Sequence, residues 1–296
     1  MRVIAEDFAA HLASGATSVC RCWRLTRMDG TVLGFTDHDC PIDFDGTVFS
    51  PATGFDGSPV AARLGGQVDT GEVLGILRSD TISEVDIALG RYDGAIVETL
   101  KVNWQDCRQR VLMRRDMIGE IVREDGVFRA ELRSPAQALN TRQGRVFHSL
   151  CDAQLGDRRC GVDLDNESLQ AAATILTVED AYRVAVSGLD AFEVGWFTFG
   201  AVRWAGGDLD GMSDVVTDHA VAAGIVTLAF SRRVGDWAFK GQALTVFAGC
   251  DRQHATCAKK FSNTVNFRGF PHIPGNDYLL RHPRNGDQLD GRPVVR

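Results

Sequence analysis

The sequence predicts a mainly β protein with two domains. Its 296 residues are enough for two domains at a typical size of ~150 residues each. Hydrophobic residues make up 44% of the chain and charged residues 24%, as in ordinary globular proteins. The 31 glycines suit short strands joined by tight turns. We therefore expect two β-rich domains, at residues 1–148 and 149–296.

The first half is predicted to contain hairpins. Asp-Gly turns separate runs that favour strands, which is a strong local hairpin signal. The predicted strands are Arg24–Arg27, Thr31–Phe35, Ile42–Phe44, Val48–Phe49, Ala95–Trp104, Val111–Ile121 and Val127–Leu132. We expect short helices at Met1–Gly15, at Glu84–Leu89 and from Ser134-Pro135 to about Gln143, because serine and proline favour the first positions of a helix.

The second half returns to strands after an irregular stretch. The predicted strands are Ala173–Leu176, Arg183–Val186, Glu193–Trp204, Asp214–Ala220, Gly224–Leu228 and Gln242–Phe247. Two segments show no strand pattern, Cys151–Asn166 and Gly249–Pro283, and the second is rich in glycine, proline, asparagine and aromatic residues. We expect both to be loops.

Charge and hydropathy exclude several classes of function. With a net charge of −7, a nucleic-acid-binding surface is not the default interpretation. Met1–Gly15 contains Glu6, Asp7 and His11 and is therefore not a secretory signal. No run reaches the ~18 apolar residues of a membrane span. No phosphate-binding glycine motif and no hydrolase nucleophile elbow is present. We expect a non-enzymatic protein made in a reducing cytoplasm.

Four of the eight cysteines form two pairs in polar, loop-like sequence. Cys151 and Cys160 enclose DAQLGDRR, and Cys250 and Cys257 enclose DRQHAT. Cysteine is usually buried, so its presence in such loops favours thiolate ligation of a metal. Disulfides and unliganded thiols stay open as alternatives, although disulfides are rare in a reducing compartment.

The spacing leaves the metal undecided. Structural zinc sites use knuckles with two to four residues between ligands, and both loops here are longer. Longer loops suit a larger group, such as an iron–sulfur cubane held by four cysteines. Nearby cations could compensate the thiolates in either case: Arg158, Arg159, Arg252, Lys259 and Lys260.

The remaining candidates have simpler interpretations. Cys20, Cys22, Cys40 and Cys107 fit core packing. Cys107 could be the nucleophile of a cell-wall Cys/His peptidase, but it follows a predicted strand, whereas such a nucleophile begins a helix. Thr36–Asp39 could bind metal or transfer protons, but it fits a solvated hairpin end. His254 could replace one cysteine ligand, and a role beside the site fits it better.

Several motifs carry a resemblance to a known family. They are Gly249-Cys250-Asp251, Thr256-Cys257, Lys260-Phe261, Asn263, Asn266–Pro271 and Pro274-Gly275, together with Gly90–Ala95 and Val102–Trp104. The chain resembles phage and gene-transfer-agent tail hub proteins in both halves. Its cysteine spacings are similar to those of the iron–sulfur domain of tail-tip protein L of lambda-like phages.

The resemblance implies a structural role in a virion. Hub proteins of this family form a ring of three at the tail tip, between the distal tail protein and a central fibre or spike, and DNA leaves through the ring. Their domains resemble the tail-tube β-barrel or β-sandwich. By resemblance, Cys151, Cys160, Cys250 and Cys257 would hold a [4Fe–4S] cluster, with zinc as the alternative. From the residue types alone, we expect Asn263, Asn266, Phe267 and Arg268 to form a rigid loop that covers the cluster.

Overall fold

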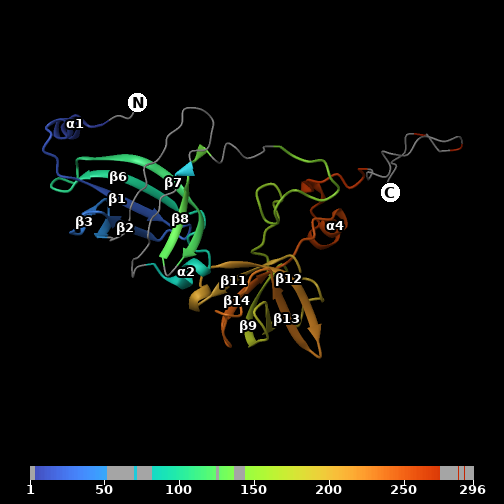
Figure 1. The fold of residues 1–296 in the computed structure, drawn as a ribbon. Helices are drawn as coiled ribbons and strands as arrows, with labels where there is room; N and C mark the ends of the chain where they lie inside the picture. The colour runs from blue at the N-terminus through green and yellow to red at the C-terminus, as the bar shows by residue number, and fades with distance from the viewer. Residues whose placement is uncertain are drawn as a thin grey trace. The chain divides into compact units, whose positions relative to one another are not determined.

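The computed structural model describes residues 4–51, 70–71, 82–124, 127–136 and 144–273, together with Gly286 and Asp290. The fold is mainly β, which confirms the predicted fold class (Figure 1). The chain divides into two compact units, Met1–Gln143 and Gly144–Arg296, whereas the sequence placed the boundary after residue 148. Most of the helix predicted at Ser134–Gln143 lies outside the described residues, as does the Asp125-Gly126 turn. None of the described helices is long and apolar enough to cross a membrane.

The first unit contains an eight-stranded sheet in the order β3-β4-β2-β1-β6-β7-β8-β5. Its strands are β1 (Val19–Thr26), β2 (Val32–Thr36), β3 (Ile42–Phe44), β4 (Thr47–Pro51), β5 (Thr70–Gly71), β6 (Ile96–Asn103), β7 (Arg110–Glu124) and β8 (Val127–Arg133). The pairs are antiparallel except for β2 with β4, which is parallel. Helices α1 (Glu6–Ala13) and α2 (Glu84–Ala88) also lie in this unit, and Ser83 caps α2 by accepting a hydrogen bond from the Val85 amide at 3.2 Å.

The central strand β1 buries side chains on both faces of this sheet. Trp23 and Leu25 point to one face and join a core cluster with Tyr92. Cys20 and Cys22 point to the other face, because side chains alternate along a strand, and pack with a cluster that contains Phe44 and Phe49. Burial on both faces explains why the β1 sequence, VCRCWRLT, lacks the simple alternation of a half-exposed strand.

The second unit contains a closed barrel in the order β10-β13-β12-β11-β14-β9. Its strands are β9 (Gln170–Val178), β10 (Arg183–Ser187), β11 (Ala201–Ala205), β12 (Ser213–Ala222), β13 (Ile225–Phe230) and β14 (Ala243–Phe247), and a 3-10 turn, η1, covers Gly207–Leu209. Alternate side chains such as Val202, Trp204, Leu244 and Val246 are buried. Closure pairs every strand edge of this barrel.

Two predictions in the second unit were wrong. The strand expected at Glu193–Trp204 begins only at Ala201, because Glu193–Gly200 forms successive turns in which Phe199 adopts φ +64°. The loop expected at Gly249–Pro283 contains helix α4 (His254–Phe261) and a 3-10 turn, η2 (Thr264–Asn266). Helix α4 ends where Ser262 takes the left-handed conformation, a common helix termination.

Candidate metal centre

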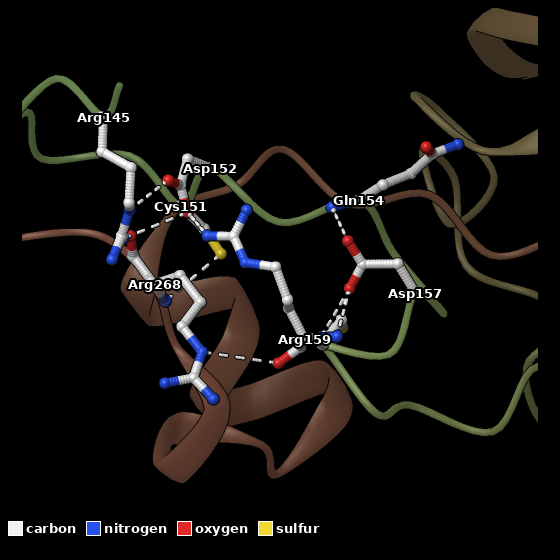
Figure 2. Close-up of polar contacts among 8 residues, drawn as sticks. Arg145, Cys151, Asp152, Gln154, Asp157, Arg159 and Arg268 are labelled. Carbon is white, nitrogen blue, oxygen red and sulfur yellow. Dashed lines mark hydrogen bonds and ion pairs between the residues drawn. The ribbon is translucent and has the colours of Figure 1, made fainter. Parts of the chain in front are cut away.

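The segment that carries Cys151 and Cys160 is shaped by a single carboxylate. Asp157 accepts hydrogen bonds from the backbone N–H groups of Gln154 (3.0 Å), Arg159 (2.8 Å) and Cys160 (2.6 Å). These bonds, the one from Cys160 above all, hold the pKa of Asp157 below its usual value. Figure 2 shows this carboxylate at the bend of the loop. The loop geometry therefore depends on Asp157 rather than on a helix or strand.

A second carboxylate holds this loop to its surroundings. Asp152 binds Arg145, with 2.7 Å between Arg145 Nε and Asp152 Oδ2, and also binds the guanidinium of Arg159. The two arginines, Arg145 first, lower the pKa of Asp152. Arg145 also donates to the backbone oxygen of Arg268 at 2.9 Å, so the carboxylate network reaches the second cysteine segment (Figure 2).

Cys250 and Cys257 lie at the exit of the barrel. Cys250 follows β14 after Gly249, where an added Cβ would lie 1.7 Å from the Thr198 oxygen, so the site requires glycine. Asp251 accepts from the Gln253 amide (2.9 Å), just before helix α4, and from the Thr256 hydroxyl (2.8 Å) in its first turn. Cys257 lies within that helix and is buried.

The two cysteine segments meet around one cavity. A cavity of about 20 Å³ is lined by all four cysteines together with apolar side chains. The lining includes Cys151, Cys160, Cys250, Cys257, Leu155, Val162, Phe261 and Phe267. The Cys151 amide donates to the Arg252 oxygen at 2.8 Å, which joins the segments directly. Residues about 90 positions apart in the sequence thus converge on one small space.

N–H groups point at three of the four sulfur atoms. The Arg252 amide lies 3.4 Å from Cys250 Sγ and the Arg268 amide lies 3.4 Å from Cys151 Sγ. The side-chain amide of Asn263 lies 3.7 Å from Cys160 Sγ. The fourth sulfur, Cys257 Sγ, donates to the Asn263 oxygen at 3.3 Å. Donors aimed at sulfur stabilise a thiolate, the form that binds metal.

The electrostatics of the cavity disfavour four free thiolates. Burial raises the pKa of Cys250 and of Cys257, and the neighbouring cysteines raise both further. Like charges gathered in a partly buried space repel, so the anionic forms require a positive partner. A bound cation would supply it, and the donor set of four sulfurs fits zinc or an iron–sulfur cluster.

No three of the four cavity sulfurs form a tight group. Among the described residues, the group of three or more potential ligands with atoms all within 4.8 Å is His38, Asp39 and Cys40, so no three of the cavity sulfurs are that close. One tetrahedral zinc ion holds its sulfurs about 4 Å apart. No three of the four sulfurs are therefore grouped as tightly as the sulfurs around one zinc ion.

Lys260 connects this centre to the barrel. Its ammonium group donates to the backbone oxygens of Trp196 and, at 2.8 Å, of Gly249. It also lies 4.3 Å from the centre of the Trp196 ring. Burial lowers the pKa of Lys260 to about 8. Lys260 thus holds Gly249, the residue before Cys250, close to Trp196 in the turns that precede β11.

The other candidates do not line the cavity. Cys107 lies in a turn after β6, and burial raises its pKa, the reverse of what an activated nucleophile needs. His38, Asp39 and Cys40 lie close together, but Asp39 is 91% exposed and His38 Nδ1 accepts the Cys40 amide at 3.0 Å. His254 packs edge-on against Phe267, with ring centres 5.0 Å apart.

Sequence reasoning missed the two organising carboxylates. Asp152 and Asp157 lie between the paired cysteines, and we considered only the basic residues of that loop. A usable signal was present, because aspartate often accepts backbone hydrogen bonds from residues two or three positions later.

The comparisons with known proteins identify the family. The model of the baseplate hub protein, N-terminal attachment domain, matches residues 5–163, more than half of the chain. This chain belongs to the baseplate hub protein family. A second family model, phage conserved hypothetical protein BR0599, matches residues 195–277.

A solved structure extends the match over both units. A chain from the "Virion of native gene transfer agent (GTA) particle" is 39% identical, with a TM-score of 0.89, over 97% of this chain and 99% of that chain. No curated protein matches. The hub protein described here is therefore a structural protein of a phage-like tail, located in the virion or a phage-like particle, where it assembles with other tail proteins.

Proposed function

We propose that this hub protein joins the distal tail protein to a central fibre or spike at the tail tip, and that it carries a structural [4Fe–4S] cluster. The ligands in this proposal are Cys151, Cys160, Cys250 and Cys257. We further propose that three copies form a ring around the DNA exit channel. The matches to a baseplate hub family and to a gene-transfer-agent virion support the tail-tip assignment.

The acidic composition suits a channel that DNA passes without binding. The net charge is −7, and like charges on a channel wall would repel phosphates. Proteins that hold DNA instead use lysine and arginine contacts to phosphate. The protein therefore has the charge sign expected of a passage rather than of a DNA-binding surface.

One observation carries the cluster proposal: four cysteine side chains from two distant segments line one cavity. N–H donors to three of the sulfurs support thiolate ligation. The long loops between the paired cysteines and the resemblance to an iron–sulfur domain favour the cluster over one zinc ion.

The cysteine segments lack an apolar core of their own. Between residues 144 and 169 the buried hydrophobic residues are Ala153 and Leu169, and between 249 and 273 there is only Cys257. The cluster, when bound, would supply four iron–thiolate bonds in place of such a core. The residues of the chain bring the loops to the site: Asp157 shapes one, and Lys260 anchors the other to the barrel. A link between distant segments restricts the unfolded chain most.

Anaerobic purification tests the cluster. We expect brown protein with a broad visible absorption band and close to four iron and four sulfide per chain. Colourless protein that contains one equivalent of zinc would instead support the zinc alternative. Protein with no metal, even after anaerobic reconstitution with iron and sulfide, would refute metal binding.

Mass measurement in solution tests the hub role separately. We expect trimers, alone or after mixing with the distal tail protein of the same particle, and co-elution of the two proteins. A monomer that binds neither the distal tail protein nor the central fibre protein would contradict the connecting role, whatever the metal content.

A further inference from the structure

Asn263 lies where the two cysteine segments meet. Its side-chain amide Nδ2 donates to the Cys160 backbone oxygen at 2.7 Å and lies 3.7 Å from Cys160 Sγ. Its own backbone N–H donates to the Cys257 oxygen at 3.1 Å, and its backbone oxygen accepts from Cys257 Sγ at 3.3 Å. One residue thus contacts a cysteine from each pair.

A neighbouring amide fixes the orientation of Asn263. Asn266 Nδ2 donates to Asn263 Oδ1 at 2.8 Å, so Oδ1 is used as an acceptor and Nδ2 faces Cys160. The opposite orientation would place Oδ1 against the Cys160 oxygen, two acceptors without a shared proton. Space is also tight here, because an added Cβ on Gly161 would lie 3.4 Å from Asn266 Nδ2.

Asn263 differs from the other donors to sulfur because it acts through its side chain. Arg252 and Arg268 use backbone N–H groups, which a substitution leaves in place. A hydrogen bond to a ligand sulfur withdraws negative charge from it, and such bonds raise the reduction potential of iron–sulfur clusters. Residues of this kind commonly change metal affinity 10–100-fold when they are altered.

We propose that Asn263 is a positioning residue for the cluster: it holds Cys160 in place and tunes the reduction potential through its N–H donor to Cys160 Sγ. This inference rests on the proposed function. Asn266 supports it by orienting the Asn263 amide.

The test compares N263D, N263A and N266A with the control V265A in the anaerobically purified full chain. Asp keeps the shape of Asn but replaces the donor by a negatively charged acceptor, whereas N263A removes the donor without adding charge, so the two variants together separate the N–H group from the added charge. Val265 lies in the same η2 turn and is 90% exposed. The measurements are the rate of iron release to a chelator and the reduction potential.

We expect N263D to release iron roughly 10-fold faster or more, N263A and N266A to release it a few-fold faster, and V265A to match the wild type. The reduction potential should fall in N263D and N263A, whereas loosened packing alone would speed iron release without a consistent fall in the potential.

If N263D does not fold, N263A and N266A carry the test. An iron-loaded N263D with wild-type release and potential would overturn the role of Asn263 alone. A wild type that binds no iron would overturn the cluster and this inference with it.

Discussion

The two units use cysteine in opposite ways. In the first unit Cys20 and Cys22 are 7% and 0% exposed and pack against aromatic side chains in a core. Their thiols donate hydrogen bonds, from Cys20 Sγ to the Val102 oxygen (3.7 Å) and from Cys22 Sγ to the Thr36 hydroxyl (3.6 Å). In the second unit, three of the four cavity sulfurs accept hydrogen bonds from N–H groups.

The direction of the hydrogen bond separates Cys20 and Cys22 from three of the four cavity cysteines, whereas Cys257, whose Sγ donates to the Asn263 oxygen, shares the donor role. A sulfur that donates is a neutral thiol, and a sulfur surrounded by donors is prepared for a negative charge. The hydrogen bond with Cys20, and then burial, raises the pKa of Cys22, which therefore stays protonated. Burial alone does not mark a ligand cysteine. For Cys151, Cys160 and Cys250, the N–H groups around the sulfur distinguish them from the core cysteines.

Replacement of a cavity cysteine should have the largest effect. Cys160→Ser removes one of the four sulfurs, and we expect nearly all visible absorption and iron to be lost, because three ligands leave one iron site open. Cys22→Ala is the matched control and should keep full iron content. Metal analysis of both proteins, purified side by side without oxygen, provides the measurement. Equal iron content in Cys160→Ser and Cys22→Ala would show that Cys160 is no more a ligand than Cys22.

Metal removal should change cysteine reactivity in the second unit alone. In the metal-free protein we expect iodoacetamide to modify Cys151 and Cys160 readily, because both are partly exposed, and the loaded protein should protect them by several-fold or more. The exposed Cys40 should react in both states, and the buried Cys22 in neither. Mass spectrometry of the peptides gives the rates. Unchanged labelling of Cys151 and Cys160 after removal would show that no ligand had covered them.

Cys22→Ala should cost stability without affecting the metal. Deletion of a well-packed sulfur leaves a small cavity beside Phe44 and Phe49, with a cost of about 1–2 kcal/mol. Denaturant titration followed by a probe in the first unit measures the loss. A destabilisation near zero would mean that this core is loosely packed.

The smallest expected effect is on the pH dependence of the free energy of unfolding. Burial lowers the pKa of His219 below its usual 6.5, and its ring nitrogens have no hydrogen-bond partner in the described part of the chain. Near pH 6.5 the unfolded chain then binds a proton that the folded chain does not, so the free energy of unfolding falls as the pH drops below that value.

His219→Leu should flatten this pH dependence between pH 5 and 7 and leave acid release of metal from the cysteines unchanged. Thermal unfolding is measured over that pH range, and metal release is followed in parallel. The two measurements distinguish the acid sensitivity of the barrel from that of the cysteine cavity. A variant with the wild-type slope would assign the acid sensitivity to other groups.

The sequence by itself determined the fold class and most strands. Asp-Gly turns and β-rich runs are local signals, and they predicted hairpins such as β3–β4, which pairs Ile42 with Phe49. The turns at Glu193–Gly200 were missed because Phe199 takes a left-handed conformation that its own preferences oppose. Helix α4 was missed because it is only eight residues long and its N-cap residue, Gln253, makes no side-chain cap hydrogen bond.

The cysteine spacing and the family resemblance predicted which four cysteines belong together, and their role as ligands stays a prediction. Only the tertiary structure decided how they meet. The closed barrel, the carboxylates of Asp152 and Asp157, and the amide of Asn263 bring two loops about 90 residues apart to one cavity. Such contacts are set by packing between distant segments, and local sequence preferences carry no information about them.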